Sequence, residues 1–247
     1  MNPLCGDDEL GYRRSRTRFA PGAGLVLDEA YRLAHLPLVA PAHPRAITTK
    51  EGAFYDRGRH PEVFSLVIPI PGEVLEAAPA WRELDAALRV APFARKLAWD
   101  ILPRRRDRLH ATLCGSLAIG EAPAIDADAR RALAELGPVT VELRGLFSGN
   151  VNLGRLYLRL YPERRDGQNV LRRIQRLLGR RETDLYLVGL HNLVDDLDPA
   201  EAAALAGLIE GWWERPLLRL EIDRLHLLGA CDDLVLDSRV VDEVALG

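Results

Sequence analysis

The sequence has little cysteine, and its three residues, Cys5, Cys114 and Cys231, are scattered and odd in number. This pattern argues against a disulfide framework and against a zinc knuckle. No apolar run approaches the roughly 18 residues of a membrane-spanning helix, and the first residues show no signal-peptide pattern. We therefore expect a cytoplasmic protein with no membrane partner.

The chain also lacks the glycine motifs that bind phosphates or present a nucleophile. Gly22-Ala23-Gly24 has neither GxGxxG spacing nor a following Lys-Ser/Thr pair, and there is no Gly-x-Ser-x-Gly elbow. Cys114 or Ser116 as a nucleophile would have no base other than His110. Because the net charge is only −3, local basic runs must supply any attraction to phosphate.

The 247 residues are 48% hydrophobic, which is enough for one sizeable core. We expect an irregular N-terminal extension at 1–62 and a folded domain at 63–247. Arginines are concentrated near the start of the extension, where they predict either a solvated arm or an arm that contacts RNA. These arginines are Arg13, Arg14, Arg16 and Arg18.

One strand carries the first candidate site residues. After the basic turn at 104–108, side chains alternate between two faces, so His110 and Thr112 share one side while the intervening residues are apolar. An imidazole can move a proton and a hydroxyl can hold a phosphate oxygen. For 104–108 itself, a solvated basic turn is favoured over a substrate contact. A lone His-x-Thr is weak evidence, so the site needs a second histidine in an equivalent place.

The regular part reads as one unit used twice: strand, helix, motif strand, helix, strand. The copies span about 63–150 and 151–247. Helices are predicted at 73–97, 125–136, 169–178 and 198–212. The first is either continuous or broken at Pro79 and Pro92, the second is capped at Asp126 or Asp128, and the fourth is capped at Asp196 or Asp198. Strands are predicted at 64–71, 139–144, 153–161, 184–194, 217–228 and 234–236, besides the His110 strand.

Superposing the two copies selects the second histidine. The strand at 64–71 matches 155–162, and the strand at 139–144 matches 218–223. Between these anchors His110 falls on His191, whereas His226 matches a position near Phe147. We therefore predict that His110 and His191 share one site.

A repeat with a histidine on the same strand of each half resembles the 2H phosphoesterase superfamily, the 2′-5′ RNA ligase-like and cyclic phosphodiesterase-like proteins. His110-Ala111-Thr112-Leu113 matches the first of the family's two His-x-Thr/Ser motifs. In the second copy, His191-Asn192-Leu193-Val194 keeps the histidine but has Leu193 in place of the hydroxyl. The resemblance covers 63 to about 240. It implies two lobes around a phosphate-binding cleft.

With the pattern of elements, the resemblance predicts an α+β, two-lobed duplicated fold, in which two antiparallel-rich sheets form a central cleft and helices cover the outer faces. A replacement phosphate ligand is available in the second lobe. Alternation along the strand at 155–161 places Arg155, Tyr157, Arg159 and Tyr161 on the open sheet face, where guanidinium groups can hold phosphate oxygens in pairs. An ordinary polar face paired with Glu142, Glu221 or Asp223 is the other interpretation.

The resemblance implies a metal-independent and cofactor-independent phosphodiesterase acting on a 2′,3′-cyclic phosphate or a 2′-5′ phosphodiester of RNA or a nucleotide. One histidine would accept a proton and the other would donate one, while Thr112 orients an oxygen. The alternative is a binding-only protein that holds RNA or a nucleotide without turning it over, because Leu193 replaces the second hydroxyl. We expect a monomer in either case.

Overall fold

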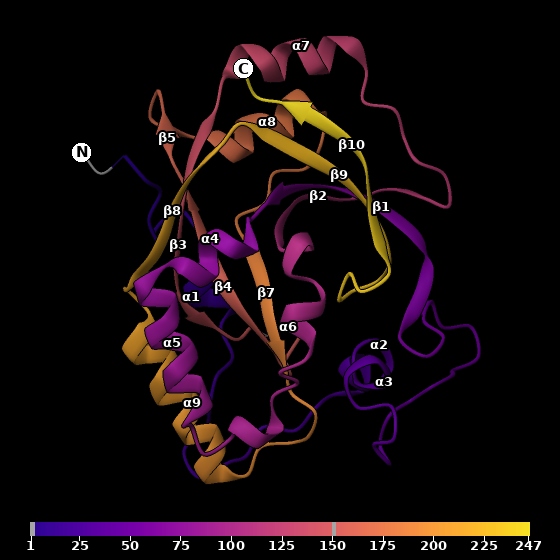
Figure 1. Ribbon diagram of the computed structural model, residues 1–247, viewed down its shortest axis with the longest axis vertical. Helices are drawn as coiled ribbons and strands as arrows, with labels where there is room; N and C mark the ends of the chain where they lie inside the picture. Colours follow the sequence, from indigo (N-terminus) through magenta and orange to yellow (C-terminus); the bar gives the residue numbers. More distant parts are fainter. Residues whose placement is uncertain (1–2, 150–151) are drawn as a thin grey trace.

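The computed structural model describes residues 3–149 and 152–247. Its centre is a curled eight-stranded sheet with the order β10-β9-β1-β2-β7-β4-β3-β8, in which neighbouring strands are antiparallel (Figure 1). Helices lie on both sides of this sheet. The predicted α+β class with antiparallel strands in two lobes is confirmed. The two expected sheets are in fact the two halves of one continuous sheet.

Each half of the sheet contributes four strands. The first half holds β1 (Arg59–Pro69), β2 (His110–Ile119), β9 (Arg224–Asp232) and β10 (Ser238–Ala245). The second half holds β3 (Val139–Phe147), β4 (Arg155–Pro162), β7 (Leu187–Asn192) and β8 (Pro216–Ile222). A separate short hairpin pairs β5 (Arg164–Arg165) with β6 (Gln168–Asn169). The halves therefore cut across the two sequence copies, because β3 joins the second half and β9 and β10 return to the first.

The two halves meet where β2 lies beside β7. Along this junction the register pairs Ala111 with Val188. Both side chains are buried. The open face on the other side of this pair is where the candidate site lies.

Helix boundaries follow the capping chemistry of the sequence. Asp126 caps α7 (Ala127–Leu136), and Asp198 with Glu201 forms a capping box at α9 (Pro199–Trp212), as the sequence predicts. Asn169 caps α8 (Val170–Leu177). The predicted helix at 73–97 is divided at Pro79 and Pro92, the two prolines at which the sequence allows a break. Its parts are α4 (Gly72–Ala77), α5 (Pro79–Arg89) and a 3₁₀ turn at Ala94–Lys96.

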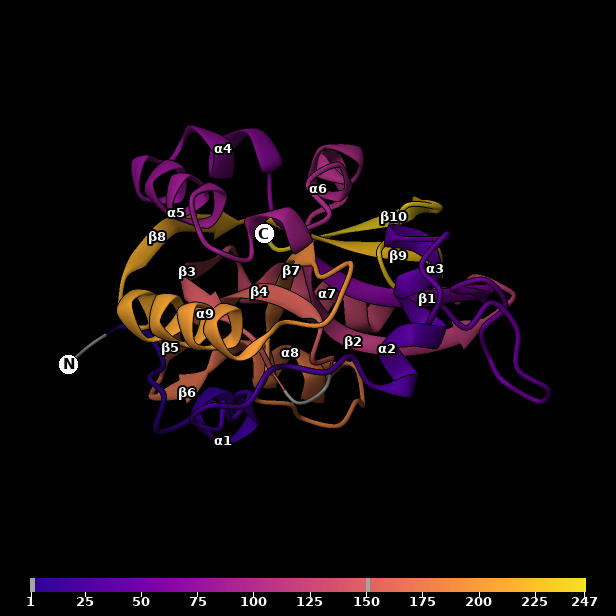
Figure 2. The ribbon, with the colours of Figure 1, turned by 90° about the horizontal axis from the view of Figure 1, so that it is seen from below.

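Two layers of helices enclose the second half of the sheet. Figure 2 shows α4, α5 and α6 (Ile101–Arg104) on one side of strands β3, β4 and β7, with α1 (Tyr12–Ser15) and α8 on the other. A 3₁₀ turn at Arg106–Arg108 then leads from α6 into β2. The first histidine of the predicted site is thus placed directly after a helical turn.

The last strands differ from their prediction. The segment 217–228 is two strands, because Asp223 lies between β8 and β9. The predicted strand at 234–236 is part of the turn between β9 and β10. The Asp232 carboxylate accepts the backbone N–H groups of Leu234 at 2.9 Å, Leu236 at 3.1 Å and Asp237 at 2.8 Å. Such local side-chain bonds favour a turn over a ladder.

The N-terminal segment packs onto the domain. Besides α1 it holds α2 (Glu29–Ala34) and α3 (Leu36–Val39), and it buries Leu4, Tyr12 and Tyr31 in the protein interior. Three of the four predicted arm arginines form ion pairs on its surface. These pairs join Arg13 to Asp7 and Glu214, Arg14 to Asp184, and Arg16 to Glu210. The expected arm is therefore held against the body of the protein.

Candidate functional site

His110 is the first residue of β2, and its ring orientation is fixed by the turn before it. Its Nδ1 lies 2.8 Å from the carbonyl oxygen of Arg108. A carbonyl can only accept, so Nδ1 carries a proton and Nε2 of the neutral ring is left with its lone pair. Burial above all, with the nearby charges of Arg155 and Arg105, lowers the pKa of His110 to about 4, although the bond to Arg108 acts to raise it. The ring is therefore neutral near pH 7.

Thr112 lies on the same face of β2 as His110. It stands opposite Val67 of β1 and is exposed, and its hydroxyl has no hydrogen-bond partner within 3–149 and 152–247. Both residues line a hollow of about 330 Å³ that also reaches β4 and β7. We call this hollow the His110 cleft. Its other lining residues are Asn152, Arg155, Tyr157, Leu185, Leu187, Gly189 and Asp233.

The register at the junction identifies the counterpart of the first motif in the second half. Ala111 faces Val188 across two antiparallel strands, so an approximate two-fold axis between them relates the residue before Ala111 to the residue before Val188. His110 therefore corresponds to Leu187, and Thr112 to Gly189. The second half presents no imidazole and no hydroxyl at these two positions of the cleft.

Arg155 occupies the space that Gly189 leaves open. A Cβ built on Gly189 would collide with the Nη2 atom of Arg155 and lie 2.7 Å from its Cζ atom. The guanidinium is anchored by Nη1, which donates to the carbonyl oxygen of Asp233 at 2.9 Å. Glycine in a strand interior often marks such a close approach. A positive charge thus lies where the second motif's hydroxyl residue would lie.

The structure does not bring His191 to His110. Leu156 of β4 stands directly opposite His191, after a bulge between Leu156 and Tyr157. Directly opposed residues share a face, so His191 lies on the face of Leu156, away from Arg155 and Tyr157. Its ring is 1% exposed and packs edge-on against Trp99, with the ring centroids 4.9 Å apart. This placement corrects the expectation of one shared site, because strict alternation cannot foresee a bulge.

The strand β4 places its two arginines in different surroundings. Arg155 and Tyr157 line the cleft, as predicted, and the Tyr157 hydroxyl accepts a bond from Asn152 at 3.1 Å. Arg159 is fully buried. It donates to the Trp213 carbonyl and to the Tyr161 hydroxyl, and it lies 3.6 Å from Asp7 of the N-terminal segment. Arg159 therefore does not reach the cleft, since that segment covers its end of the sheet.

Asp233 is a cleft residue that the sequence interpretation missed. Its carboxylate accepts the Tyr55 hydroxyl at 2.8 Å and lies 3.4 Å from Nε2 of His60. Burial acts to raise the pKa of Asp233. The contacts to His60 and Tyr55 and the nearby His35 lower it more strongly, so the pKa is about 2. The carboxylate is thus ionised beside Arg155. The sequence prediction joined β8 and β9 into one strand at 217–228. Alternation along that single strand could not show that Asp233, which follows β9, reaches the cleft.

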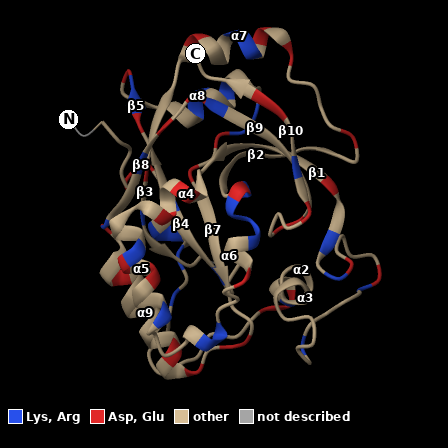
Figure 3. Ribbon diagram, in the orientation of Figure 1, with Lys and Arg blue, Asp and Glu red and all other residues tan. Residues whose placement is uncertain are grey.

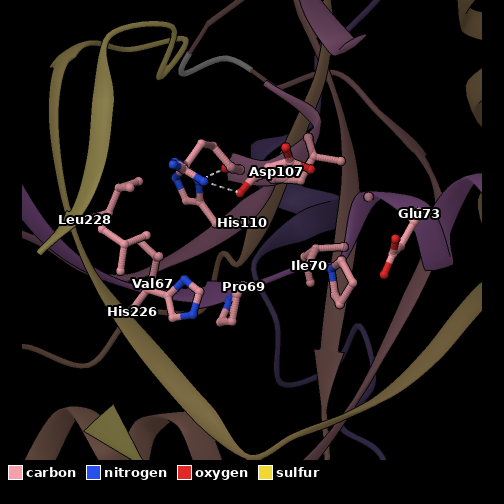
Figure 4. A pocket seen from close by; sticks show the side chains of 13 residues that line it. Val67, Pro69, Ile70, Glu73, Asp107, His110, His226 and Leu228 are labelled. Atoms are coloured by element: carbon pink, nitrogen blue, oxygen red, sulfur yellow. Dashed lines mark hydrogen bonds between the residues drawn. The ribbon is translucent and has the colours of Figure 1, made fainter. Parts of the chain in front are cut away.

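His226 of β9 is the second missed residue. It stands opposite Val67, which also pairs with Thr112, so it shares the open face with the first motif. His110 and His226 line one hollow of about 290 Å³, shown with its side chains in Figure 4. Burial lowers the pKa of His226, and Glu243 at 3.8 Å acts in the opposite direction. The histidine that the sequence superposition rejected is therefore the one that lies near His110.

The basic segment at 104–108 lies inside the curl of the sheet, at the end of α6 (Figure 3). Its member Arg105 is 2% exposed and donates Nη2 to the Leu190 carbonyl at 2.7 Å. No carboxylate lies within ion-pair distance of this guanidinium in the described ranges. Burial and the neighbouring Arg155 both lower the pKa of Arg105. The guanidiniums of Arg105 and Arg155 outnumber the one ionised carboxylate of the cleft, that of Asp233, and this excess favours an anion.

Other chemistry has little support at this site. Cys114 is buried, and burial raises the pKa of its thiol to about 11, which keeps it protonated and poorly nucleophilic at pH 7. Among the described residues, no group of three or more His, Cys, Asp or Glu side chains is placed to hold a metal ion. In the same ranges, no helix is long and apolar enough to cross a membrane.

Comparisons with known proteins give matches among solved structures. No protein-family model matches the sequence, and no curated protein does. E. coli LigT complexed with NADP⁺ matches with a TM-score of 0.37 and 15% identity over 76% of this chain and 99% of LigT. TT0787 of Thermus thermophilus gives 0.39 and 15% over 74% and 97%, and a structure described as a phosphoesterase gives 0.36 and 14% over 76% and 99%. These matches assign no role to any residue here.

Proposed function

We propose that the His110 cleft binds the phosphate of a nucleotide or of an RNA end, and that it does so without the two-histidine chemistry expected from His110 and His191. The observation that supports this proposal is the pairing of Ala111 with Val188, from which Leu187 and Gly189 take the positions of the second motif. The guanidinium of Arg155 fills the space beside Gly189. A cationic anchor therefore replaces a proton-transfer group.

Three side chains would hold the phosphate. Arg155 supplies charge-assisted hydrogen bonds, the exposed Thr112 hydroxyl supplies one donor, and neutral His110 presents an acceptor to a protonated oxygen of the phosphate or to a ribose hydroxyl. Asp233 lies at the same hollow as an ionised acceptor. An anionic acceptor beside a phosphate anchor suits a ligand that also carries hydroxyl or amino donors, as a nucleotide does.

A second candidate function keeps hydrolysis and uses His226. It is favoured by one observation: His110 and His226 line the same hollow. Neutral His110 would accept a proton from the attacking water or hydroxyl, and protonated His226 would donate one to the leaving oxygen. In this candidate Thr112 orients a non-bridging oxygen, as in the first.

The test is a paired binding and turnover assay with a 2′,3′-cyclic mononucleotide. The variants are His110→Ala, His226→Ala and His191→Phe, each checked for a native circular dichroism spectrum. The binding proposal predicts saturable binding without turnover, and binding that weakens in His110→Ala but not in His191→Phe. Turnover that disappears in both His110→Ala and His226→Ala would establish the second candidate instead. Turnover lost in folded His191→Phe, or no binding to the unaltered protein, would contradict both.

A further inference from the structure

A separate hollow lies beside α5, α6 and the end of β7, apart from the His110 cleft. Its volume is about 290 Å³, and it shares none of its lining residues with the three hollows that include His110. We call it the His191 pocket. It is lined by Glu76, Trp81, Arg82, Asp85, Arg89, Trp99, Leu102, Pro103 and His191.

His191 is an unsatisfied polar group in this pocket. Its ring is 1% exposed, yet neither Nδ1 nor Nε2 has a hydrogen-bond partner within the described part of the chain. Burying a polar group without a partner is costly, and native proteins rarely leave both atoms of a ring unpaired. Burial is the main cause, and the charge of Arg105 the second, that lowers the pKa of His191 to about 4. The ring is therefore neutral and offers one donor and one acceptor.

Aromatic rings form the apolar part of the pocket. Trp81 is buried, and Trp99 is held by a bond from its Nε1 atom to the Ala94 carbonyl at 2.9 Å. The Arg89 guanidinium lies over the Trp99 ring, 4.4 Å from its centroid, and His191 packs against the same ring, so a ligand can stack only on the indole surface that these two side chains leave open. Fixed indole rings offer flat surfaces on which a planar ligand can stack.

The charges around the pocket balance. Its lining holds two carboxylates and two guanidiniums, so their formal sum is zero. Arg89 pairs with Asp85 at 2.7 Å, and Glu76 pairs with Arg106 at 3.0 Å. This balance favours an uncharged ligand over an anion.

We infer that the His191 pocket binds an uncharged planar heterocycle of the nucleobase kind, stacked on tryptophan and hydrogen-bonded at its edge to His191. The edge of a nucleobase presents donors and acceptors, and a ring nitrogen of the neutral imidazole can pair with one of them as donor or as acceptor. The volume lies at the lower end of the roughly 300–1,000 Å³ of ligand pockets, which suits one or two fused rings. This inference does not rest on the function proposed for the His110 cleft.

The experiment titrates free adenine and free uracil into the protein, with tryptophan fluorescence and calorimetry as readouts. His191→Phe keeps a ring of similar shape and removes both nitrogens, so binding of the base should weaken at least tenfold. His43→Gln, at a loop histidine outside both sites, is the matched control and should bind the base as the unaltered protein does. Equal affinity in His191→Phe, or no binding of either base at millimolar concentration, would overturn the inference.

A measurement on the unaltered protein guards against a variant that fails to fold. Imidazole nitrogen resonances are followed by NMR during the adenine titration. We expect the His191 signals to shift and the His110 signals to stay in place. Unchanged His191 signals at a base concentration that quenches the fluorescence would contradict the inference.

Discussion

The two halves of the sheet share a strand pattern but carry different chemistry at the cleft. The first half presents His110 and Thr112 from β2, whereas β7 presents Leu187 and Gly189 at the related positions. The second half supplies the cleft with Arg155 instead, and it places His191 on the opposite face. A duplicated backbone thus fixes where a side chain points but not which chemistry it provides.

The largest expected effect concerns how the second half is covered. In Asp7→Ala, buried Arg159 loses its carboxylate partner, and the Tyr161 hydroxyl and the Trp213 indole lose an acceptor. Removing one partner of a buried ion pair costs about 3–5 kcal/mol. Urea denaturation should show a loss of that size. A loss below about 1 kcal/mol would mean that the N-terminal segment does not hold this half together.

Next in size is the removal of the cationic anchor. Arg155→Gln deletes the guanidinium beside Gly189, so the affinity for inorganic phosphate should fall by about 1.5–3 kcal/mol, which is a factor of ten or more. Isothermal titration calorimetry measures the change. Arg13→Gln, which removes an exposed arginine outside the cleft, is the matched control and should bind phosphate normally. Equal loss in both variants would show a general charge effect.

A subtler change tests the position of that guanidinium without removing it. The added methyl group of Gly189→Ala collides with the end of the Arg155 side chain, which is flexible and can move aside. We expect near-native stability and a phosphate affinity reduced by about 1 kcal/mol. Thermal melting and calorimetry on the same sample separate the two effects. Unchanged affinity would mean that the guanidinium binds equally well from another position.

A separate prediction concerns the pH dependence of stability. Burial lowers the pKa of His35, His110 and His191 to about 4 in each case, whereas an unfolded chain has values near roughly 6.5. As the pH falls through this window the unfolded chain binds protons before the folded one, so the free energy of unfolding decreases.

The variants His191→Phe and His60→Gln test the sign of this dependence. His191→Phe removes one low-pKa group and should lose less stability on acidification. The pKa of His60 is raised, so its stabilising contribution is present at low pH and fades as the pH rises through its folded value. His60→Gln should therefore lose more stability on acidification. Urea denaturation at several pH values measures both slopes, and equal slopes in the two variants would refute the assignment.

Local signals in the sequence predicted much of the fold. Alternation at His110 and Thr112 gives β2, and the caps Asp126 and Asp198 give α7 and α9, because these patterns depend on near neighbours in the chain. The placement of Arg155 on the open face follows in the same way.

What the sequence could not predict depends on distant contacts. The bulge that turns His191 away lies in the pairing of β7 with β4, and the covering of Arg159 depends on Asp7, far away in the chain. Gly189 in a strand interior was the available signal for a close approach beside it. Asp223 was the residue that could have indicated a break between β8 and β9. With that break, His226 lies on a separate strand, β9, which pairs with β1.

The most direct test of this asymmetry is an NMR titration of the unaltered protein with inorganic phosphate, observing the imidazole nitrogens. We predict that the His110 signals shift with saturation while the His191 signals stay fixed, because only His110 lines the cleft with Arg155. His191 signals that shift together with those of His110, at the same phosphate concentration, would contradict this prediction and restore the paired-histidine site.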